Sequence, residues 1–140
     1  MFVKKTEKIF ESAKQVNSMT PRDFIDYCLA KTGACEDYPF GLEVTVIKVD
    51  GKIFAQFFKL DGKDTATFNA DRLMSEFYIA QYPNVVVRGW HCPPVQQPYF
   101  NTLPLDGTLD DTVIKEMIDN SYNYVVSKLP KYKQKELKSK

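Results

Sequence analysis

The strongest pattern along the chain is a pair of β-rich runs, residues 44–49 and 52–58, joined by Asp50-Gly51. An Asp-Gly pair between two such runs is typical of a two-residue hairpin turn, which would place Val49 opposite Lys52. Because side chains alternate along a strand, this register assigns every residue of the hairpin to one face of a sheet. One face then carries Val44, Val46, Ile53, Ala55 and Phe57, and the other carries Thr45, Ile47, Val49, Phe54 and Phe58, with Glu43 and Gln56.

Both faces of this hairpin are rich in apolar side chains. The first face is expected to be core. The second is too apolar to be fully exposed, because large apolar patches on a protein surface usually mark a covered or interacting region. We therefore expect either an N-terminal helix or a second subunit, as in a homodimer, to cover part of this sheet face.

Shorter β signals follow the hairpin. Asp61-Gly62 predicts a second tight turn into a strand at about 64–68, residues 85–87 predict a short buried strand, and residues 99–105 alternate like a last strand. Two stretches are expected to be irregular loops: 36–41 and the proline-rich 89–98. Strands joined by short turns, with helices before, between and after them, favour an α+β fold of two layers, in which an antiparallel sheet packs against helices.

Capping residues and apolar periodicity predict three helices in the body of the chain. Thr20 as N-cap and Pro21 at the first position begin one helix, and Gly33 ends it. Asn69 is expected to cap a short helix whose inner face includes Leu73, Met74 and Phe77. The longest helix is expected to have Thr108 as its N-cap and to bury a stripe of Val113, Ile114, Met117, Ile118, Ser121, Val125 and Leu129.

The two ends of the chain differ from this body. Residues 1–18 space their apolar side chains like one face of a helix, whereas residues 131–140 are lysine-rich and have too little apolar content to fold alone. We therefore expect a helical extension at 1–18, one domain at 19–130 and a basic tail at 131–140. No apolar run is long enough to span a membrane, and three cysteines without close pairing fit reduced thiols in the cytoplasm.

A net charge of +1 hides a strong asymmetry between these parts. Residues 20–127 carry nine Lys or Arg against fifteen Asp or Glu, a balance of −6, whereas residues 128–140 carry six Lys against one Glu, a balance of +5. An acidic body repels a polyanion, and each contact to a phosphate requires a cation near it. Binding to DNA would therefore depend on the C-terminal lysines or on a local cluster of the other basic residues.

The residues that carry catalysis or hold metals in other proteins form no recognisable motif. The single histidine, His91, adjoins Cys92, but the cysteines lack the close ligand pairs of structural zinc sites. Glu36 and Asp37 are neighbouring carboxylates without a partner that would separate their pKa values. No glycine-rich phosphate loop is present. We expect a protein that is not an enzyme and that needs no metal or cofactor.

Two groups of residues remain as candidate binding sites. Arg88, Trp90 and His91, followed by Asn101, bring cationic, aromatic and amide groups to one loop and strand, and such groups stack on bases or bind peptides. The alternative is that the aromatic residues are core and that Asn101 satisfies backbone groups. The C-terminal lysines, among them Lys128, Lys131 and Lys133, together with Lys63, are candidates for phosphate contacts, against the alternative of a solvated terminus.

Several segments also occur in the order and spacing of a known family. The N-terminal half contributes Tyr27-Cys28-Leu29, Gly33-Ala34, Glu36-Asp37-Tyr38-Pro39-Phe40-Gly41, Thr45-Val46 and Lys48-Val49-Asp50-Gly51-Lys52-Ile53-Phe54-Ala55. The C-terminal half contributes Gln81-Tyr82-Pro83, Gly89-Trp90-His91, Asn101-Thr102, Leu105-Asp106-Gly107, Ile118-Asp119-Asn120-Ser121-Tyr122 and Lys128-Leu129-Pro130-Lys131. This ordered set, over roughly residues 19–131, resembles the MmcQ/YjbR family.

The resemblance implies a compact α+β fold similar to CyaY and to secretion chaperones. Proteins of this family are commonly labelled DNA-binding, by structural analogy. One departure concerns the stretch after the histidine, which in the family is polar and basic and ends in His-Trp. Here residues 92–100 contain no basic residue and no second histidine, and Phe100 takes the place of the tryptophan.

Two functions follow as expectations. The resemblance and the basic tail suggest a DNA-binding protein without catalytic activity, with contacts from Lys63, Arg88, Trp90, His91, Asn101, Lys128, Lys131 and Lys133. The alternative is a chaperone-like module that binds a protein or peptide through the apolar sheet face. Neither expectation involves a membrane.

Overall fold

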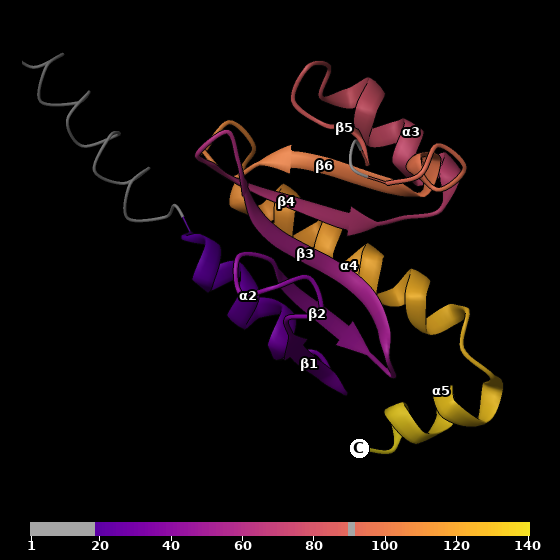
Figure 1. The fold of residues 1–140 in the computed structure, drawn as a ribbon. Helices are drawn as coiled ribbons and strands as arrows, with labels where there is room; N and C mark the ends of the chain where they lie inside the picture. Colours follow the sequence, from indigo (N-terminus) through magenta and orange to yellow (C-terminus); the bar gives the residue numbers. More distant parts are fainter. Residues whose placement is uncertain (1–18, 90–91) are drawn as a thin grey trace, which may run out of the picture.

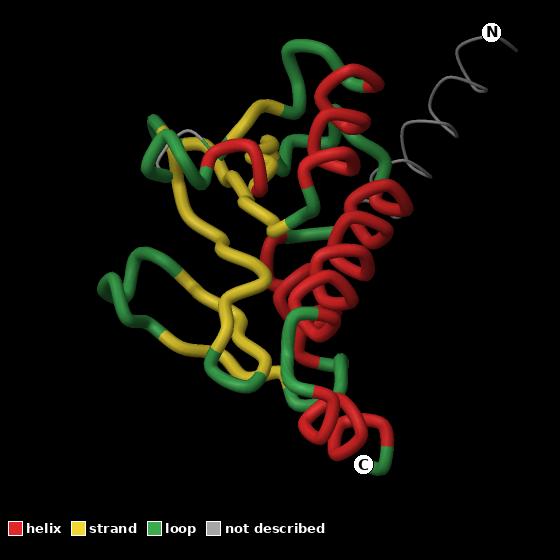
Figure 2. Tube along the Cα trace, turned by 90° about the vertical axis from the view of Figure 1, so that its right-hand side faces the viewer, coloured by secondary structure: helices red, strands yellow, loops and turns green. Residues whose placement is uncertain are grey.

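The computed structural model describes residues 19–89 and 92–140, so the helix expected over residues 1–18 lies outside the described part. The described chain forms a six-stranded antiparallel sheet with its α-helices gathered against one face, while the short 3₁₀ helix η1 (Gln97–Tyr99) lies in the loop before β6 (Figures 1 and 2). The predicted α+β architecture is thereby confirmed. We call the face that the four described α-helices leave uncovered the open face.

Three consecutive strands form the centre of the sheet: β2 (Thr45–Val49), β3 (Lys52–Leu60) and β4 (Lys63–Asn69). Both predicted tight turns are present, because Val49 pairs with Lys52 and Leu60 pairs with Lys63. In the first turn Asp50 has a φ of 49° and Gly51 a φ of 76°, which is the left-handed pair of a type I′ turn.

The outer strands differ more from the prediction. β1 (Ala34–Asp37) pairs with β2, β6 (Phe100–Pro104) pairs with β4, and β5 (Val87–Arg88) pairs with β6, so the order is β1-β2-β3-β4-β6-β5. The prediction of a loop from residue 36 was wrong for Glu36 and Asp37, because an edge strand needs only one partner and little apolar content. The strand expected at 85–87 is shifted, and its two residues are exposed at the other edge.

Two of the helices follow their sequence signals closely. In α2 (Pro21–Leu29), Thr20 and Asp23 form a reciprocal capping box. In α4 (Asp111–Ser127), the predicted stripe faces the sheet, with Val125 and four other residues buried. α4 begins two residues later than expected, with Asp110 as its N-cap, because Asp106 accepts hydrogen bonds from both the amide and the hydroxyl of Thr108.

The inner face predicted for α3 (Arg72–Gln81) was correct for Met74, which packs against the core, and wrong for Leu73 and Phe77. Its N-cap is Asp71 rather than Asn69, and its buried side chains are Ser75 and Tyr78. Leu73 is 81% exposed and Phe77 53% exposed. The polar pair faces inward because each member bonds to a neighbouring element: Ser75 to Asn101 of β6, and Tyr78 to Glu116 and Asn120 of α4.

The lysine-rich end is a docked helix rather than a solvated tail. α5 (Lys131–Lys138) follows Pro130 and packs Leu137 against the hydrophobic core. Lys133 forms an ion pair with Asp50 of the β2–β3 turn at 2.8 Å. The sequence suggested too little apolar content for this segment to fold alone. In the structure, Leu137 packs against the body of the protein and holds the helix in place.

A β-bulge changes the assignment of faces in the central hairpin. Lys48 pairs with Ile53 as predicted, but Ile47 pairs with Ala55, so Phe54 is the extra residue. Beyond the bulge every residue of β3 moves to the opposite face relative to β2. Val46 therefore shares a face with Gln56, and Ile47 with Ala55, which corrects the predicted faces.

The correction separates two phenylalanines that the sequence placed together. Phe54 is buried against α4, where its ring meets Tyr122 edge to face at 5.4 Å. Phe58 lies on the open face. Within residues 19–89 and 92–140, no helix combines the length and the hydropathy that crossing a bilayer requires.

Candidate functional site

The open face of the sheet carries a cavity of about 530 Å³. We call it the open-face pocket. Its floor comes from strands and its walls come from the two loops that precede β2 and β6. The strand-side residues are Val44, Ile53, Gln56, Phe58 and Phe100, and the loop residues are Phe40, Cys92, Pro93 and Gln96.

The bulge in β3 determines which side chains form the floor. After it, Gln56 and Phe58 face away from the helices, while Phe57 turns toward the core and meets Phe68. The residues paired with Gln56 lie on the same face of the sheet, and they are Val46 of β2 on one side and Thr67 of β4 on the other. Without the extra residue, Gln56 would face the core.

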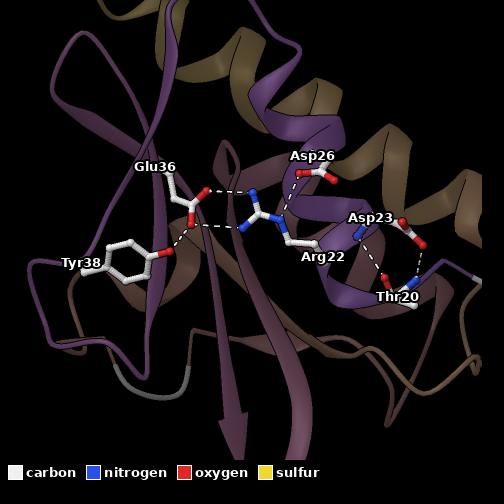
Figure 3. A network of polar contacts seen from close by, with 6 residues as sticks. All are labelled: Thr20, Arg22, Asp23, Asp26, Glu36 and Tyr38. Atoms are coloured by element: carbon white, nitrogen blue, oxygen red, sulfur yellow. Dashed lines mark hydrogen bonds and ion pairs between the residues drawn. The ribbon is translucent and has the colours of Figure 1, made fainter.

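The wall that carries Phe40 is anchored by a polar network at the edge of the sheet. Figure 3 shows the guanidinium of Arg22 between Asp26 of the same helix and Glu36 of β1. Two guanidinium nitrogens donate to the two oxygens of Glu36, at 3.1 and 3.2 Å, and the hydroxyl of Tyr38 donates to the same carboxylate. These contacts fix the start of the loop 38–44.

The electrostatics of this network follow from the same contacts. The Tyr38 hydroxyl, together with the Arg22 guanidinium, lowers the pKa of Glu36, because both stabilise the charged carboxylate. The ammonium of Lys48 lies 2.8 Å from Asp37 and lowers the pKa of that carboxyl group. Both acids are therefore charged anchors of β1, which gives Glu36 and Asp37 a structural role.

The second wall depends on Gly89. Its amide donates to the carbonyl oxygen of Phe100 at 3.1 Å, and its carbonyl oxygen accepts from the amide of Cys92. A Cβ atom at this position would lie 2.7 Å from Cβ of Phe100 and 2.8 Å from Sγ of Cys92. Only glycine allows the loop 92–99 to fold back over β6 at this distance.

The pocket is apolar and aromatic in character. Among its described lining residues none is charged, and the polar groups are the amides of Gln56 and Gln96 and the thiol of Cys92. Burial raises the pKa of the Cys92 thiol, so this group is protonated and uncharged at neutral pH. Such a surface favours an uncharged, largely apolar ligand.

Those residues singled out by the sequence that the structure describes do not converge on one site. Asn101 points toward the helices and donates to the carbonyl and hydroxyl oxygens of Ser75, and its own carbonyl oxygen has no hydrogen-bond partner among the described residues. Arg88 is exposed on the edge strand β5, and Lys63 is exposed at the β3–β4 turn. Trp90 and His91 lie outside the described residues.

The C-terminal lysines gather near α5, at the end of β3 opposite to Lys63 (Figure 1). Lys133 is engaged with Asp50, whose carboxylate raises the pKa of the lysine. Lys131 is exposed at the start of α5. Lys128 is exposed, and its ammonium lies 5.2 Å from the ring centroid of Tyr124.

Most pocket residues were not predicted as a site. The sequence indicated a second apolar sheet face, but assigned Phe54 to it and placed Val44 and Ile53 in the core. The signal for the floor was Gln56, a single polar side chain inside the run from Ile53 to Phe58. The loop residues carried no signal, because their meeting depends on how two loops distant in sequence fold.

The three cysteines are distant in sequence and lie in different environments. Cys28 is buried in the core, Cys35 is exposed on β1, and Cys92 lines the open-face pocket. Within the described ranges, no group of three His, Cys, Asp or Glu side chains lies close enough together to hold a metal ion.

Two curated bacterial proteins are similar to this chain over most of their length. One is named Uncharacterized protein YjbR, from Escherichia coli (strain K12); it is 28% identical over 117 residues, which cover 84% of this chain and 96% of that protein. The other is named Uncharacterized protein YbdF, from Escherichia coli O157:H7; it is 25% identical over 132 residues, covering 94% of this chain and 96% of that protein.

Two solved structures share the fold. The Deinococcus radiodurans protein DR2400, whose domain is described as DUF419, superimposes with a TM-score of 0.76 at 24% identity, over 86% of this chain and 89% of that one. A Pseudomonas syringae protein gives a TM-score of 0.62 at 18% identity, over 74% and 96%. The YjbR family model matches residues 29–124. This chain belongs to the YjbR family.

Proposed function

We propose that the chain is a non-catalytic binding protein whose open-face pocket takes up an apolar side chain from a protein partner. The observation that carries the proposal is the cavity itself, which has an aromatic and aliphatic lining on the face that the described helices leave uncovered. A cavity of this size, with few polar groups, is the form that sites for apolar side chains take.

The surroundings of the pocket support a protein partner. Phe40 is 63% exposed, and Leu42 and Val95 in the two wall loops are also exposed. Apolar residues that extend outward from a pocket are typical of an interface with another polypeptide, since they bury further area when a chain crosses the rim. The body of the protein carries a balance of −6 over residues 20–127, which favours a segment with basic residues beside its apolar anchor.

The test selects binding peptides from a displayed library of random linear peptides, using the full chain as bait. Two variants change the pocket at partly exposed positions, Phe40→Asp in the wall and Val44→Lys beside the floor. Each is expected to weaken the selected peptides by about tenfold or more, because a charge in an apolar pocket must be desolvated. Leu73→Asp, at an exposed apolar residue of α3, is the matched control and is expected to leave affinity unchanged.

The contrary results are equally clear. Peptides that bind all three variants as tightly as the unchanged protein would show that the pocket is not the site. A library that yields no enriched peptide would count against a peptide-binding function as a whole.

Binding to DNA is the second candidate function, and α5 supplies the observation that favours it. Lys131, Lys135 and Lys138 are exposed and spaced i, i+4 and i+7, which places them along one side of the helix. This stripe could follow a phosphate backbone, although the acidic body opposes a wider contact.

Three substitutions test the lysine stripe without undocking α5. The triple variant Lys131→Gln, Lys135→Gln, Lys138→Gln keeps Leu137 and the Lys133–Asp50 ion pair in place. If the stripe binds duplex DNA, fluorescence anisotropy should give a plot of log affinity against log salt with a slope of about −3, and the variant should lose that binding. Equal affinity of the variant, or a slope near zero, would reject the stripe.

A further inference from the structure

Among the described residues on the strand floor of the open-face pocket, Gln56 at the centre of β3 is the one with a polar side chain. It is 9% exposed and lines the cavity. Among the described residues, none of the hydrogen bonds involves its side-chain amide, and its neighbour Thr67 bonds to Thr102 at 2.8 Å instead. The two donors and two acceptor lone pairs of the Gln56 amide are not sealed from solvent, so they are available to a ligand that enters the cavity.

The position of this amide limits the chemistry of the group that satisfies it. Gln56 lies on the sheet, beneath the walls formed by Phe40 and Pro93, while Phe58 and Phe100 give the cavity aromatic surface. A group that reaches Gln56 must therefore be apolar and aromatic over most of its length and must carry a hydrogen-bonding atom at its far end. Tyrosine and tryptophan side chains combine these two features, whereas phenylalanine has only the first and leucine is apolar without being aromatic.

A protein segment fits this site better than a nucleic acid. Sites that stack bases pair their aromatic residues with cations that follow the phosphates. No lysine or arginine is among the described lining residues, and residues 20–127 carry a balance of −6. An uncharged side chain on a polypeptide carries no phosphate, so it does not require these cations and is not repelled by the negative charge of the body.

We propose that the open-face pocket is specific for a tyrosine or tryptophan side chain of a protein partner, and that the amide of Gln56 selects it by hydrogen bonding to the hydroxyl or indole N–H group. This inference rests on the proposed function and adds the identity of the anchor residue. The rim residue Phe40 packs against the partner's neighbouring residues, and Gln56 acts as the specificity-determining group.

The test uses four small probes with the full chain: the N-acetyl amides of tyrosine, tryptophan, phenylalanine and leucine. Binding is measured by ¹H–¹⁵N NMR titration, which follows weak ligands and locates them on the pocket amides. The tyrosine and tryptophan probes are expected to bind about five- to tenfold more tightly than the phenylalanine probe, the gain from one additional hydrogen bond in the pocket. The leucine probe should bind more weakly than the aromatic ones.

The variant Gln56→Met removes the amide while keeping an unbranched side chain of similar length. It is expected to abolish the preference, so that phenylalanine binds at least as tightly as tyrosine, because the tyrosine hydroxyl then stays unpaired. If Gln56→Met does not fold, the order of the four probes on the unchanged protein still decides the question. A phenylalanine probe that binds as well as tyrosine there would overturn the inference.

The remaining outcomes separate this inference from the proposed function. If all aromatic probes bind in the pocket with equal affinity, the pocket survives as a binding site and the role of Gln56 is rejected. If no probe shifts the pocket amides, the proposed function fails as well. A short oligothymidylate that shifts the same amides in a Gln56-dependent manner would reassign the site to single-stranded nucleic acid and overturn the inference.

Discussion

Buried polar side chains connect the helices to the sheet at defined points. Ser121 of α4 is fully buried; its hydroxyl donates to the carbonyl oxygen of Phe54 at 2.5 Å and accepts from the amide of Asn69 at 2.9 Å. These two backbone groups lie at the bulge of β3 and at the end of β4, where regular sheet pairing leaves groups to be satisfied. Ser121 therefore supports the bulge that forms the pocket floor.

Replacing Ser121 by alanine should destabilise the protein by about 2–4 kcal/mol, because it leaves a buried carbonyl and a partly buried amide without their partner. Urea unfolding followed by circular dichroism measures the change. Ser127→Ala is the matched control, since that hydroxyl is exposed and bonds only within its own helix. A loss for Ser121→Ala that does not exceed the loss for Ser127→Ala would contradict the structural role.

The buried thiol of Cys28 is expected to lower the free energy of unfolding as the pH rises into the alkaline range. Desolvation in the core raises the pKa of its thiol from 9.0 to about 12. Between these values the folded protein keeps the proton while the unfolded chain releases it, so the thiol's contribution is complete below pH 9 and declines as pH rises. The stability difference between the unchanged protein and Cys28→Ala should fall by about 2 kcal/mol from pH 7.5 to pH 10.5 in urea unfolding experiments. A constant difference would show that the thiol ionises equally in both states.

At the scale of elements, the sequence predicted correctly those turns and helix caps that depend on only a few neighbouring residues. The Asp-Gly turns and the Thr20 cap were correct because a turn or a cap is decided within a few residues. The bulge at Phe54, the strand β1 and the docking of α5 were not predictable in this way, because each depends on a partner distant in sequence. The inward face of α3 failed for the same reason, since Ser75 and Tyr78 are buried by bonds to β6 and α4.

Because α5 docks on the body, substitutions at Gly33 and Leu137 are expected to have non-additive effects on the free energy of unfolding. Gly33 has a φ of +76°, and a Cβ atom there would lie 2.6 Å from Cδ2 of Leu137. Gly33→Ala should cost about 1–2 kcal/mol for the left-handed backbone and about 1 kcal/mol more for the overlap. Gly107→Ala is the control, because its φ is +86° and nothing lies within 4 Å of the added atom.

A double-mutant cycle separates the overlap from the backbone cost. In the background of Leu137→Ala, the additional cost of Gly33→Ala should disappear, and the variant should match Gly107→Ala in thermal or urea unfolding. An unchanged cost in that background would show that α5 does not pack on Gly33.

At the scale of the whole molecule, the sheet separates two kinds of surface. The helices seal one face into a core, and the open face keeps an apolar pocket between two loops. The sequence indicated an apolar second face but not its composition, because the extra residue in β3 changes which residues of the preceding strand share a face with Gln56 and Phe58. The charge asymmetry was visible in the sequence, but the partial neutralisation of the C-terminal lysines by Asp50 was not.

The most direct test of the central claim is to map a selected peptide onto the full chain by ¹H–¹⁵N NMR. The account predicts that the perturbed amides lie within residues 40–44, 53–58 and 92–100, which contain the two wall loops and the floor of the pocket. Perturbations confined to α5, or to the exposed face of α3 around Leu73 and Phe77, would show that the partner binds elsewhere and would contradict it.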